Sequence, residues 1–456
     1  METMVGSIGS SEYRSAGKHR ATAWYSNWSN SPIGEMIEPV ALVRHSLYVG
    51  ALFHENRGPG YSVADNGETH MKITKTEVFV LGDPEPAKPS GTRVSELAFV
   101  RIHTDEGITG TSEVFAVPAG VVRTVLDGPD SLFGQTLLGE DPIPPLRLRT
   151  RLYNNMVHGN RRGWAIICIG AVEVALWDIF GKVMARPVYQ LLGGAERSRY
   201  RVTDPSQRHE VVPYCSLISA LRDPESTVRE HVEKVEQLKE QGFRGVKLEP
   251  MEVPPETIVE VTRRSREILG PDVMLAVDNG YGFSDVPTAL RVMEELAQYD
   301  VYFFETPFEV DALEAYAELT AKSPVPIAAG EHTVTRWEFL DLMDRGGLQV
   351  VQPYMTTCGG LSEVIHVLDL AAPRGVQVIP GNWSTHVLSA ATVHLAAFST
   401  ITPFFEYVPA QLFSSPLRSA IMEHGFTVVD GAIPYPTAPG IGIEIPDDLI
   451  EHFRVG

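Results

Sequence analysis

Short apolar runs alternate with amphipathic stretches through the second half of the chain. The clearest helical pattern repeats an apolar residue every three or four positions and stops at Gly242: Val228, Val232, Val235 and Leu238. A short strand, residues 245–249, follows it, and further apolar strands end near six positions: Asp278, Glu305, Glu331, Tyr354, Gly381 and Glu406. Counted from Glu249, successive ends lie 23 to 29 residues apart, which corresponds to one β/α unit per repeat.

Eight such units would close a barrel and bring one strand-end residue from each unit to a single face. An open, doubly wound sheet is the alternative, but it gives no reason for carboxylates at three successive strand ends. The pattern therefore favours an α/β fold with a (β/α) barrel in the second half of the chain.

The first half of the chain has a different pattern. Residues 1–70 are rich in Ser, Gly, Asn and Pro and show little periodicity, so we expect an extension that is disordered in part. Two β-rich runs between Leu97 and Ser112 flank the turn at residues 105–107, and a helix is expected over residues 171–184. Strands followed by helices predict an α+β unit that begins at Met71.

Composition narrows the class of protein. A length of 456 residues suggests two or three domains, and a net charge of −20 argues against nucleic-acid binding, which needs clustered Lys and Arg. The three cysteines lie far apart and indicate neither a disulfide framework nor a zinc site. No apolar run approaches the ~20 residues of a membrane span, and the N-terminus lacks a signal peptide's apolar stretch. We expect a cytoplasmic protein that contacts no membrane.

Three acids end successive apolar strands. Strand alternation groups each acid with two apolar residues: Met274 and Ala276 with Asp278, Val301 and Phe303 with Glu305, and Ile327 and Ala329 with Glu331. Any one of these acids alone would be read as an ordinary solvated side chain. Three carboxylates that converge would repel one another without a cation, and oxygen ligands suit Mg²⁺. The sequence therefore predicts a Mg²⁺ site at this face.

Several longer segments carry a family resemblance that covers roughly residues 71–456. They are residues 175–182, 187–194, 242–248, 328–331, 359–363 and 438–444. Together they resemble the mandelate racemase branch of the enolase superfamily and its acid-sugar dehydratases.

The resemblance implies an α+β capping domain over residues 71–195, a modified TIM barrel over 196–415, and a tail over 416–456 that completes the cap. It places loops of the cap, about residues 84–96 and 113–122, over the site. It also assigns Asp278, Glu305 and Glu331 as ligands of one Mg²⁺, and we expect a homo-oligomer.

The acid–base residues depart from the family pattern. Strand two usually ends Lys-x-Lys, but this chain has Lys247 and Glu249. An Asp on strand six usually orients a His on strand seven, and here those positions are Tyr354 and Gly381. Both usual bases are therefore absent.

The remaining polar residues supply candidates for the chemistry. Lys247 and Glu249 both point into the lumen, and an adjacent carboxylate favours a charged Lys247, so we expect it to hold the substrate carboxylate. Glu406 matches a family acid on strand eight and is expected to bond the same carboxylate. The candidates for proton transfer are Glu249, Tyr354, His332 and His386.

These features predict a Mg²⁺-dependent lyase that removes the α-proton of a small carboxylate substrate and dehydrates an acid sugar. An isomerase that uses the same intermediate (a racemase, epimerase or cycloisomerase) is the first alternative. A homologue that binds metal without turnover is the second.

Overall fold

The computed structural model describes residues 70–83, 96–194, 209–219, 223–409, 412 and 415–455. The chain divides into two units, Met1–Gly67 and Glu68–Gly456, and every described residue belongs to the second. The expected extension over residues 1–70 lies outside the described residues except for its last residue, and the expected cap loop lies outside them over residues 84–95. Both expectations stay predictions.

Eight parallel strands form one sheet in the order β11-β10-β9-β8-β7-β6-β5-β12. They are β5 (Pro213–Ser219), β6 (Gly245–Pro250), β7 (Met274–Asp278), β8 (Phe304–Glu305), β9 (Ile327–Ala329), β10 (Val350–Val351), β11 (Gln377–Val378) and β12 (Phe405–Tyr407). Two backbone hydrogen bonds join its outer edges, from Val378 N to Ile401 O (3.1 Å) and from Glu406 N to Pro380 O (2.9 Å). The sheet therefore closes as a barrel, as the sequence period predicted, and the carboxyl ends of its strands meet at one face.

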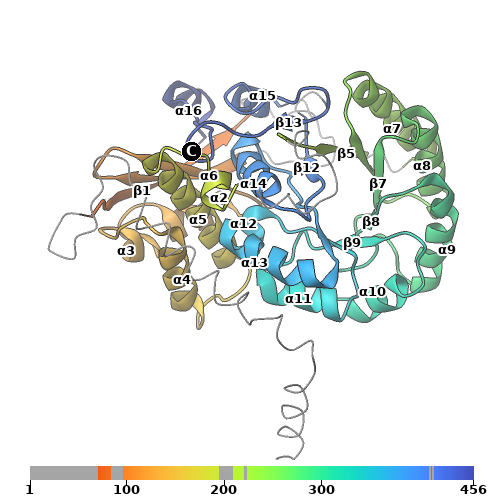
Figure 1. Ribbon diagram of the computed structural model, residues 1–456, viewed down its shortest axis with the longest axis horizontal. Coiled ribbons are helices and arrows are strands. Elements are labelled where there is room, and N and C mark those ends of the chain that lie inside the picture. The colour runs from red at the N-terminus through yellow and green to blue at the C-terminus, as the bar shows by residue number, and fades with distance from the viewer. Residues whose placement is uncertain are drawn as a thin grey trace, which may run out of the picture. The chain divides into compact units, whose positions relative to one another are not determined.

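Helices follow the strands and lie on the outside of the sheet, where α7 to α11 form an arc (Figure 1). They are α7 (Pro224–Glu240), α8 (Pro255–Leu269), α9 (Val286–Leu296), α10 (Leu313–Thr320), α11 (Thr335–Asp344), α12 (Met355–Cys358), α13 (Leu361–Ala371) and α14 (His386–Phe398). Helix α7 confirms the expected pattern: Asp223 caps it by accepting from Ser226 N, and Val228, Val235 and Leu238 are buried.

The barrel lumen is filled by side chains from alternate strand positions: Tyr214, Met274, Ala276, Phe303, Ala328, Val350 and Ile379. On β7 this confirms the expected alternation, and before β8 it confirms Phe303 but not Val301, which packs in the outer core. On β9 the expectation was wrong, because Ala328 faces the lumen while Ile327 and Ala329 pack in the outer core. The strand ends at Ala329, and Gly330 has a φ of +132°, so the backbone changes direction before Glu331.

Residues 70–194, which we call the cap, form an antiparallel sheet covered by helices. The elements are β1 (Ile73–Gly82), β2 (Glu96–Thr104), β3 (Thr109–Val114), α2 (Ala119–Leu126), α3 (Gly134–Leu137), α4 (Pro145–Met156), α5 (Trp164–Val183) and α6 (Val188–Leu191). The turn expected at residues 105–107 is confirmed between β2 and β3.

Helix α5 begins earlier than expected. Within the described residues it is the one helix long and apolar enough to span a membrane, but its apolar window is 83% buried in the protein core.

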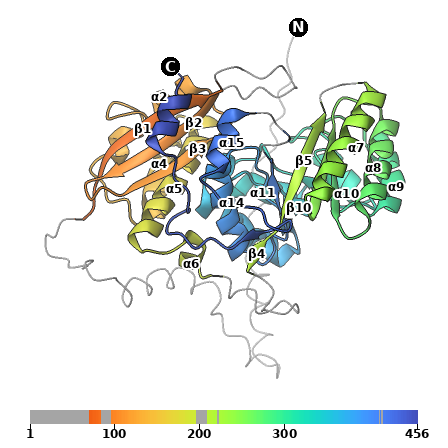
Figure 2. The ribbon, with the colours of Figure 1, turned by 90° about the horizontal axis from the view of Figure 1, so that it is seen from above.

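The C-terminal segment returns to the cap (Figure 2). It contains α15 (Pro416–Met422), a two-residue strand β13 (Ile433–Pro434) that pairs with β4 (Glu210–Val211), and α16 (Asp447–Phe453). Val455 N donates to Val80 O on β1 (2.9 Å), and Arg101 on β2 pairs with Asp447 (2.9 Å). These contacts agree with a tail that completes the cap, while the exact domain boundaries stay predictions.

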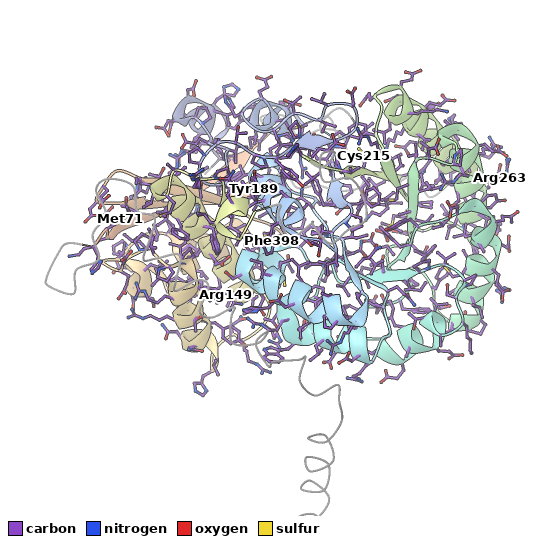
Figure 3. The ribbon with its side chains drawn as sticks, in the orientation of Figure 1. Met71, Arg149, Tyr189, Cys215, Arg263 and Phe398 are labelled. Atoms are coloured by element: carbon purple, nitrogen blue, oxygen red, sulfur yellow. The ribbon has the colours of Figure 1, made fainter. Side chains whose placement is uncertain are left out.

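A buried ion-pair network fastens the cap to the barrel. Arg149 on α4, labelled in Figure 3, donates its Nε to Gly359 O (3.2 Å) and pairs with Glu363 on α13. Arg336 on α11 donates to the same carboxylate (2.6 Å). Because two guanidinium groups compensate the buried charge, Glu363 keeps a lowered pKa against the opposing effect of burial. The network fixes the cap above the strand ends.

Candidate active site

Five carboxylic acids gather at the carboxyl ends of the barrel strands, and we call them the carboxylate cluster: Glu249, Asp278, Glu305, Glu331 and Glu406. Asp278 and Glu305 are register partners on β7 and β8, so their side chains lie next to each other. Glu331 stands beyond the end of β9 and is half-buried, whereas the other four are at most 4% exposed. The strand spacing therefore placed these acids correctly at one face.

Lys247 stands at the centre of this cluster. Its Nζ lies 2.7 Å from Glu305 Oε2, 2.9 Å from Glu406 Oε1, 3.4 Å from Asp278 Oδ2 and 3.5 Å from Glu249 Oε1. Burial alone would lower the pKa of Lys247, but Glu305 and Glu406 outweigh it and raise that pKa well above its usual range. This direction favours a charged ammonium, in line with the expectation from its carboxylate neighbour.

The cluster holds more acid than one ammonium balances. Burial raises the pKa of Glu305 well above its usual range, and repulsion from Asp278 and Glu406 adds to this against the pull of Lys247. Burial and Asp278 raise the pKa of Glu331 in the same direction. A buried group of oxygen donors with excess negative charge favours an added cation.

Glu249 differs from the other acids because one of its oxygens is uncommitted. Its Oε1 is buried without a hydrogen bond from the described residues, although Lys247 is 3.5 Å away. Burial raises the pKa of Glu249 to about 8, with Lys247 opposing and Asp278 and Glu406 adding to the rise. A carboxyl group of this kind can exchange a proton near neutral pH.

Two hydroxyl groups that the sequence did not single out orient the acids. Thr306 Oγ1 donates to Asp278 Oδ1, which also accepts from Gly280 N (2.8 Å), and Tyr281 OH donates to Glu331 Oε1 (2.6 Å). Thr306 and Tyr281 both have left-handed backbone, with φ of +44° and +65°. Such conformations in non-glycine residues are costly and gather at functional sites. Their position directly after strand ends was the available signal.

The three acids expected to bind a metal have donor atoms that suit a divalent cation, although their side chains do not already surround an ion. Among the described residues, no three Asp, Glu, His or Cys side chains are arranged to enclose an ion. Lys247 stands between Asp278 and Glu305, and Glu331 is turned to Tyr281. The donors are nevertheless all carboxylate oxygens, and the pKa values of Glu305 and Glu331 are raised by burial and further by mutual repulsion. Hard ions such as Mg²⁺ prefer this donor set.

Glu406 is saturated with hydrogen-bond donors. Its Oε1 accepts from Lys247, Ser216 Oγ and Trp383 Nε1 (3.0 Å), and its Oε2 accepts from Asn382 N (2.6 Å) and Tyr354 OH (3.2 Å). These donors hold the pKa of Glu406 below its usual range although burial alone would raise it. A carboxylate offers about four lone-pair sites. Glu406 is therefore a fixed counter-ion that positions Lys247, and it has little capacity left for a substrate.

Tyr354 lies beside Glu406 and is buried between the barrel and the cap. Its ring stacks on Phe115, which follows β3 in the cap, with 5.2 Å between centroids. Phe115 belongs to the loop over residues 113–122 that was expected to cover the site. That loop does reach the strand ends.

Of the two histidine candidates, His386 lies apart from the cluster and His332 lies at its exposed edge. His386 stacks on Phe426 (4.1 Å between centroids) and contacts Tyr407 OH (3.2 Å), whose side chain alternates away from that of Glu406. Burial lowers the pKa of His386 to about 4, so it is a neutral packing residue, and the expectation that it swings into the site is corrected. His332 is exposed, stacks on Tyr281 and lies 3.4 Å from Glu331.

Cap and tail together hold the segment that carries Asn382 and Trp383. Glu113 on β3 accepts from the backbone N (2.9 Å) and Oγ1 (2.7 Å) of Thr385. Arg418 on α15 donates to the carbonyl oxygens of Trp383 (2.8 Å) and Ser384 (3.1 Å). Glu113 and Arg418 were not identified from sequence, because both contact residues that are distant along the chain.

Two cavities of about 440 and 410 Å³ lie at the opposite, amino-terminal end of the strands. Tyr302 lines both, and Gln349 and Gln377 line the larger. No member of the carboxylate cluster lines either cavity. The chemistry therefore belongs to the carboxyl end of the barrel, where active sites of this architecture form.

Known proteins resemble this chain in architecture and in sequence. Residues 75–193 match the family described as "Mandelate racemase / muconate lactonizing enzyme, N-terminal domain", and residues 230–449 match "Enolase C-terminal domain-like". The chain is 30% identical over 362 residues to an arabinonate dehydratase of Saccharolobus solfataricus, covering 79% of this chain and 91% of that protein.

Two cycloisomerases are also similar. A D-galactarolactone cycloisomerase of Agrobacterium fabrum is 28% identical over 394 residues, covering 84% of this chain and 99% of that protein. The crystal structure of the 3,6-anhydro-D-galactonate cycloisomerase from Zobellia galactanivorans superposes with a TM-score of 0.72 at 27% identity, covering 84% of this chain and all of that one. The chain thus belongs to the enolase superfamily, in the branch of mandelate racemase and muconate lactonizing enzyme.

Proposed function

We propose that this protein is an acid-sugar dehydratase that uses Mg²⁺ held by Asp278, Glu305 and Glu331. Membership of the enolase superfamily implies a divalent metal ion, and the oxygen-only donors favour Mg²⁺ among such ions. The observation that carries the proposal is the buried ammonium of Lys247 among acids at the strand ends. An anionic substrate and its developing charge need positive charge at the site, which Lys247 and the metal ion would supply.

The bound metal would act as a Lewis acid toward the substrate carboxylate. Lys247 binds the same carboxylate and, because its charge is fixed, stabilises the negative charge that develops when the α-proton leaves. In its ionised form Glu249 accepts that proton, since it has an uncommitted buried oxygen beside Lys247. Glu406 holds Lys247 in place.

The site has side chains suited to proton abstraction on the side of β6, and Gly381, which follows β11, presents none. Racemisation needs groups on both faces of the substrate, so a one-sided site favours elimination of a β-hydroxyl. Cycloisomerisation is the second candidate, because two relatives carry that name and it also begins from an α-carbanion. The two reactions differ in product: dehydration releases water, whereas cycloisomerisation keeps the mass of the substrate.

The test is a screen of the full chain with Mg²⁺ against aldonates, aldarates and their lactones. Mass spectrometry should show a product that has lost one water from at least one aldonate or aldarate. A product of unchanged mass from a lactone alone would replace dehydration by cycloisomerisation. Absence of turnover, and of deuterium uptake at the α-carbon of every compound in D₂O, would contradict both functions and leave a metal-binding homologue without turnover.

Two variants separate the roles of the β6 residues. Lys247→Ala should lower turnover by several orders of magnitude, and wild-type α-deuterium exchange in this variant would contradict its role. Glu249→Gln should nearly abolish exchange while Mg²⁺ affinity by calorimetry is retained. A modest loss would mean that Glu249 only pairs with Lys247. The exposed residues Lys322 and Glu267 give matched controls, as Lys322→Ala and Glu267→Gln.

A further inference from the structure

Tyr354 and Gly381 fit each other on adjacent segments of the barrel mouth. A Cβ at position 381 would lie 2.2 Å from Cε2 and 2.6 Å from Cδ2 of the Tyr354 ring. Gly381 is not among the residues with positive φ, so glycine is not needed there for its backbone conformation. It is needed for space, because the tyrosine ring occupies the volume that a side chain at position 381 would fill.

The ring is also fixed from its other side. Phe115 stacks on it with an interplanar angle of 23°, so the aromatic ring is held between the barrel backbone and the cap. A phenylalanine would fill this space equally well. The hydroxyl group of Tyr354 therefore requires an explanation beyond packing.

The Tyr354 hydroxyl makes the longest of the five contacts that Glu406 accepts, at 3.2 Å. When it turns away, Oε2 still accepts from Asn382 N, and Oε1 still accepts from Lys247, Ser216 and Trp383. The phenol can turn to another acceptor without leaving Glu406 uncompensated. Burial and the adjacent Glu406 raise the pKa of Tyr354 well above its usual range, so the hydroxyl carries its proton when substrate arrives.

The hydroxyl is close to the group expected to hold the substrate. Lys247 Nζ and Tyr354 OH bind the two oxygens of one carboxylate, that of Glu406. When the substrate carboxylate contacts Lys247, the β-carbon of the substrate is only two bonds from the carboxyl carbon. This arrangement brings a β-hydroxyl within reach of the phenol.

We propose that Tyr354 is the general acid of the elimination and protonates the departing β-hydroxyl. The assignment rests on the proposed dehydratase function. The α-C–H bond breaks and its proton goes to Glu249; the electron pair forms the Cα–Cβ double bond. The Cβ–O bond breaks, and the leaving oxygen takes the phenol proton and departs as water. Proton return from Glu249 to the phenolate restores both groups, and the enol becomes the 2-keto acid.

Tyr354→Phe tests this step, because it keeps the ring against Gly381 and Phe115 and removes only the acid. Dehydration of the best substrate among D-arabinonate, the D-hexonates and the hexarates should slow by about a hundredfold or more, the usual contribution of a general acid. Deuterium exchange at the α-carbon should continue within a few-fold of wild type. The corresponding 3-deoxy-3-fluoro compound should restore elimination, since fluoride leaves without a proton.

Tyr302→Phe is the matched control, because it removes a tyrosine hydroxyl that bonds Gln377 at the opposite end of the barrel. Gly381→Ala, which displaces the Tyr354 ring, should repeat the pattern of lost dehydration with retained exchange. Wild-type dehydration in Tyr354→Phe, an equal loss of exchange, or no rescue by the fluoro compound would each overturn the assignment. If the wild-type protein dehydrates none of these acids, the proposed function fails instead.

Discussion

Adding one methyl group at Gly381 should strain the barrel mouth by a predictable amount. The new Cβ would lie 2.2 Å from the Tyr354 ring, whereas carbon atoms in contact lie about 3.5–4.0 Å apart. The ring must therefore retreat by at least ~1 Å, and Phe115 blocks its other face. Overpacking of a fixed site costs about 1–3 kcal/mol. Because both neighbours are constrained, we expect Gly381→Ala to lose about 2–3 kcal/mol, near the upper end.

A double-mutant cycle isolates this clash. In a Tyr354→Ala background the added methyl has room, so Gly381→Ala should then change stability by less than about 0.5 kcal/mol, giving a coupling of more than ~1 kcal/mol. Thermal and urea unfolding, each followed by circular dichroism and tryptophan fluorescence, measure the four proteins. Gly120→Ala is the control, because nothing lies within 4 Å of a Cβ there and the residue is in helix α2. It should be neutral or slightly stabilising.

The reasoning would be refuted by a Gly381→Ala protein that unfolds at the wild-type midpoint. It would equally be refuted if the stability losses of Gly381→Ala and Tyr354→Ala were additive in the double mutant. Either result would mean that the Tyr354 ring is not held against residue 381 in the folded protein.

Three further predictions concern other parts of the chain. Glu305→Ala should abolish the single Mg²⁺-binding site seen by calorimetry, and unchanged affinity would remove this residue from the ligand set. A chain that begins at Met71 should unfold within a few degrees of the full chain; a drop of many degrees would show that residues 1–70 pack on the barrel or support assembly. Because the pKa of His386 is lowered to about 4 against ~6.5 in the unfolded chain, the unfolded state binds more protons between these values and stability falls as pH falls through them. His386→Phe should thus lose less thermal stability than wild type between pH 7 and pH 5, and its α-deuterium exchange should be unchanged. The same pH response as wild type, or a loss of exchange, would contradict the assignment of His386 as a packing residue.

The strand-end acids could be read from sequence because a β/α repeat is a local pattern with a fixed period. Asp278 ends a strand whose alternation is regular, as the lumen contacts of Met274 and Ala276 confirm, and Glu305 follows Phe303, which also faces the lumen, although Val301 does not. Glu331 was assigned to the correct end of the barrel for an incorrect reason. Gly330 turns the backbone, and alternation does not extend past a residue with positive φ.

Other features needed contacts that no local pattern encodes. His386 was a candidate because it lies five residues past Gly381, the position where the family resemblance expects a histidine. Its burial against Phe426 of the tail became visible once residues distant in sequence were brought together. The expected homo-oligomer and cytoplasmic location depend on contacts and surroundings outside a single chain, so they stay predictions.

The sequence by itself determined the repeating β/α units, the face on which the acids gather and the absence of the usual Lys and His bases. These properties follow from residue type and spacing along one strand or helix. Only the tertiary structure decided that Lys247 lies among four acids, that Glu406 is saturated, and that Tyr354 occupies the space beside Gly381. Charge balance, hydrogen-bond capacity and steric fit depend on distances between strands, and closure of the barrel sets those distances.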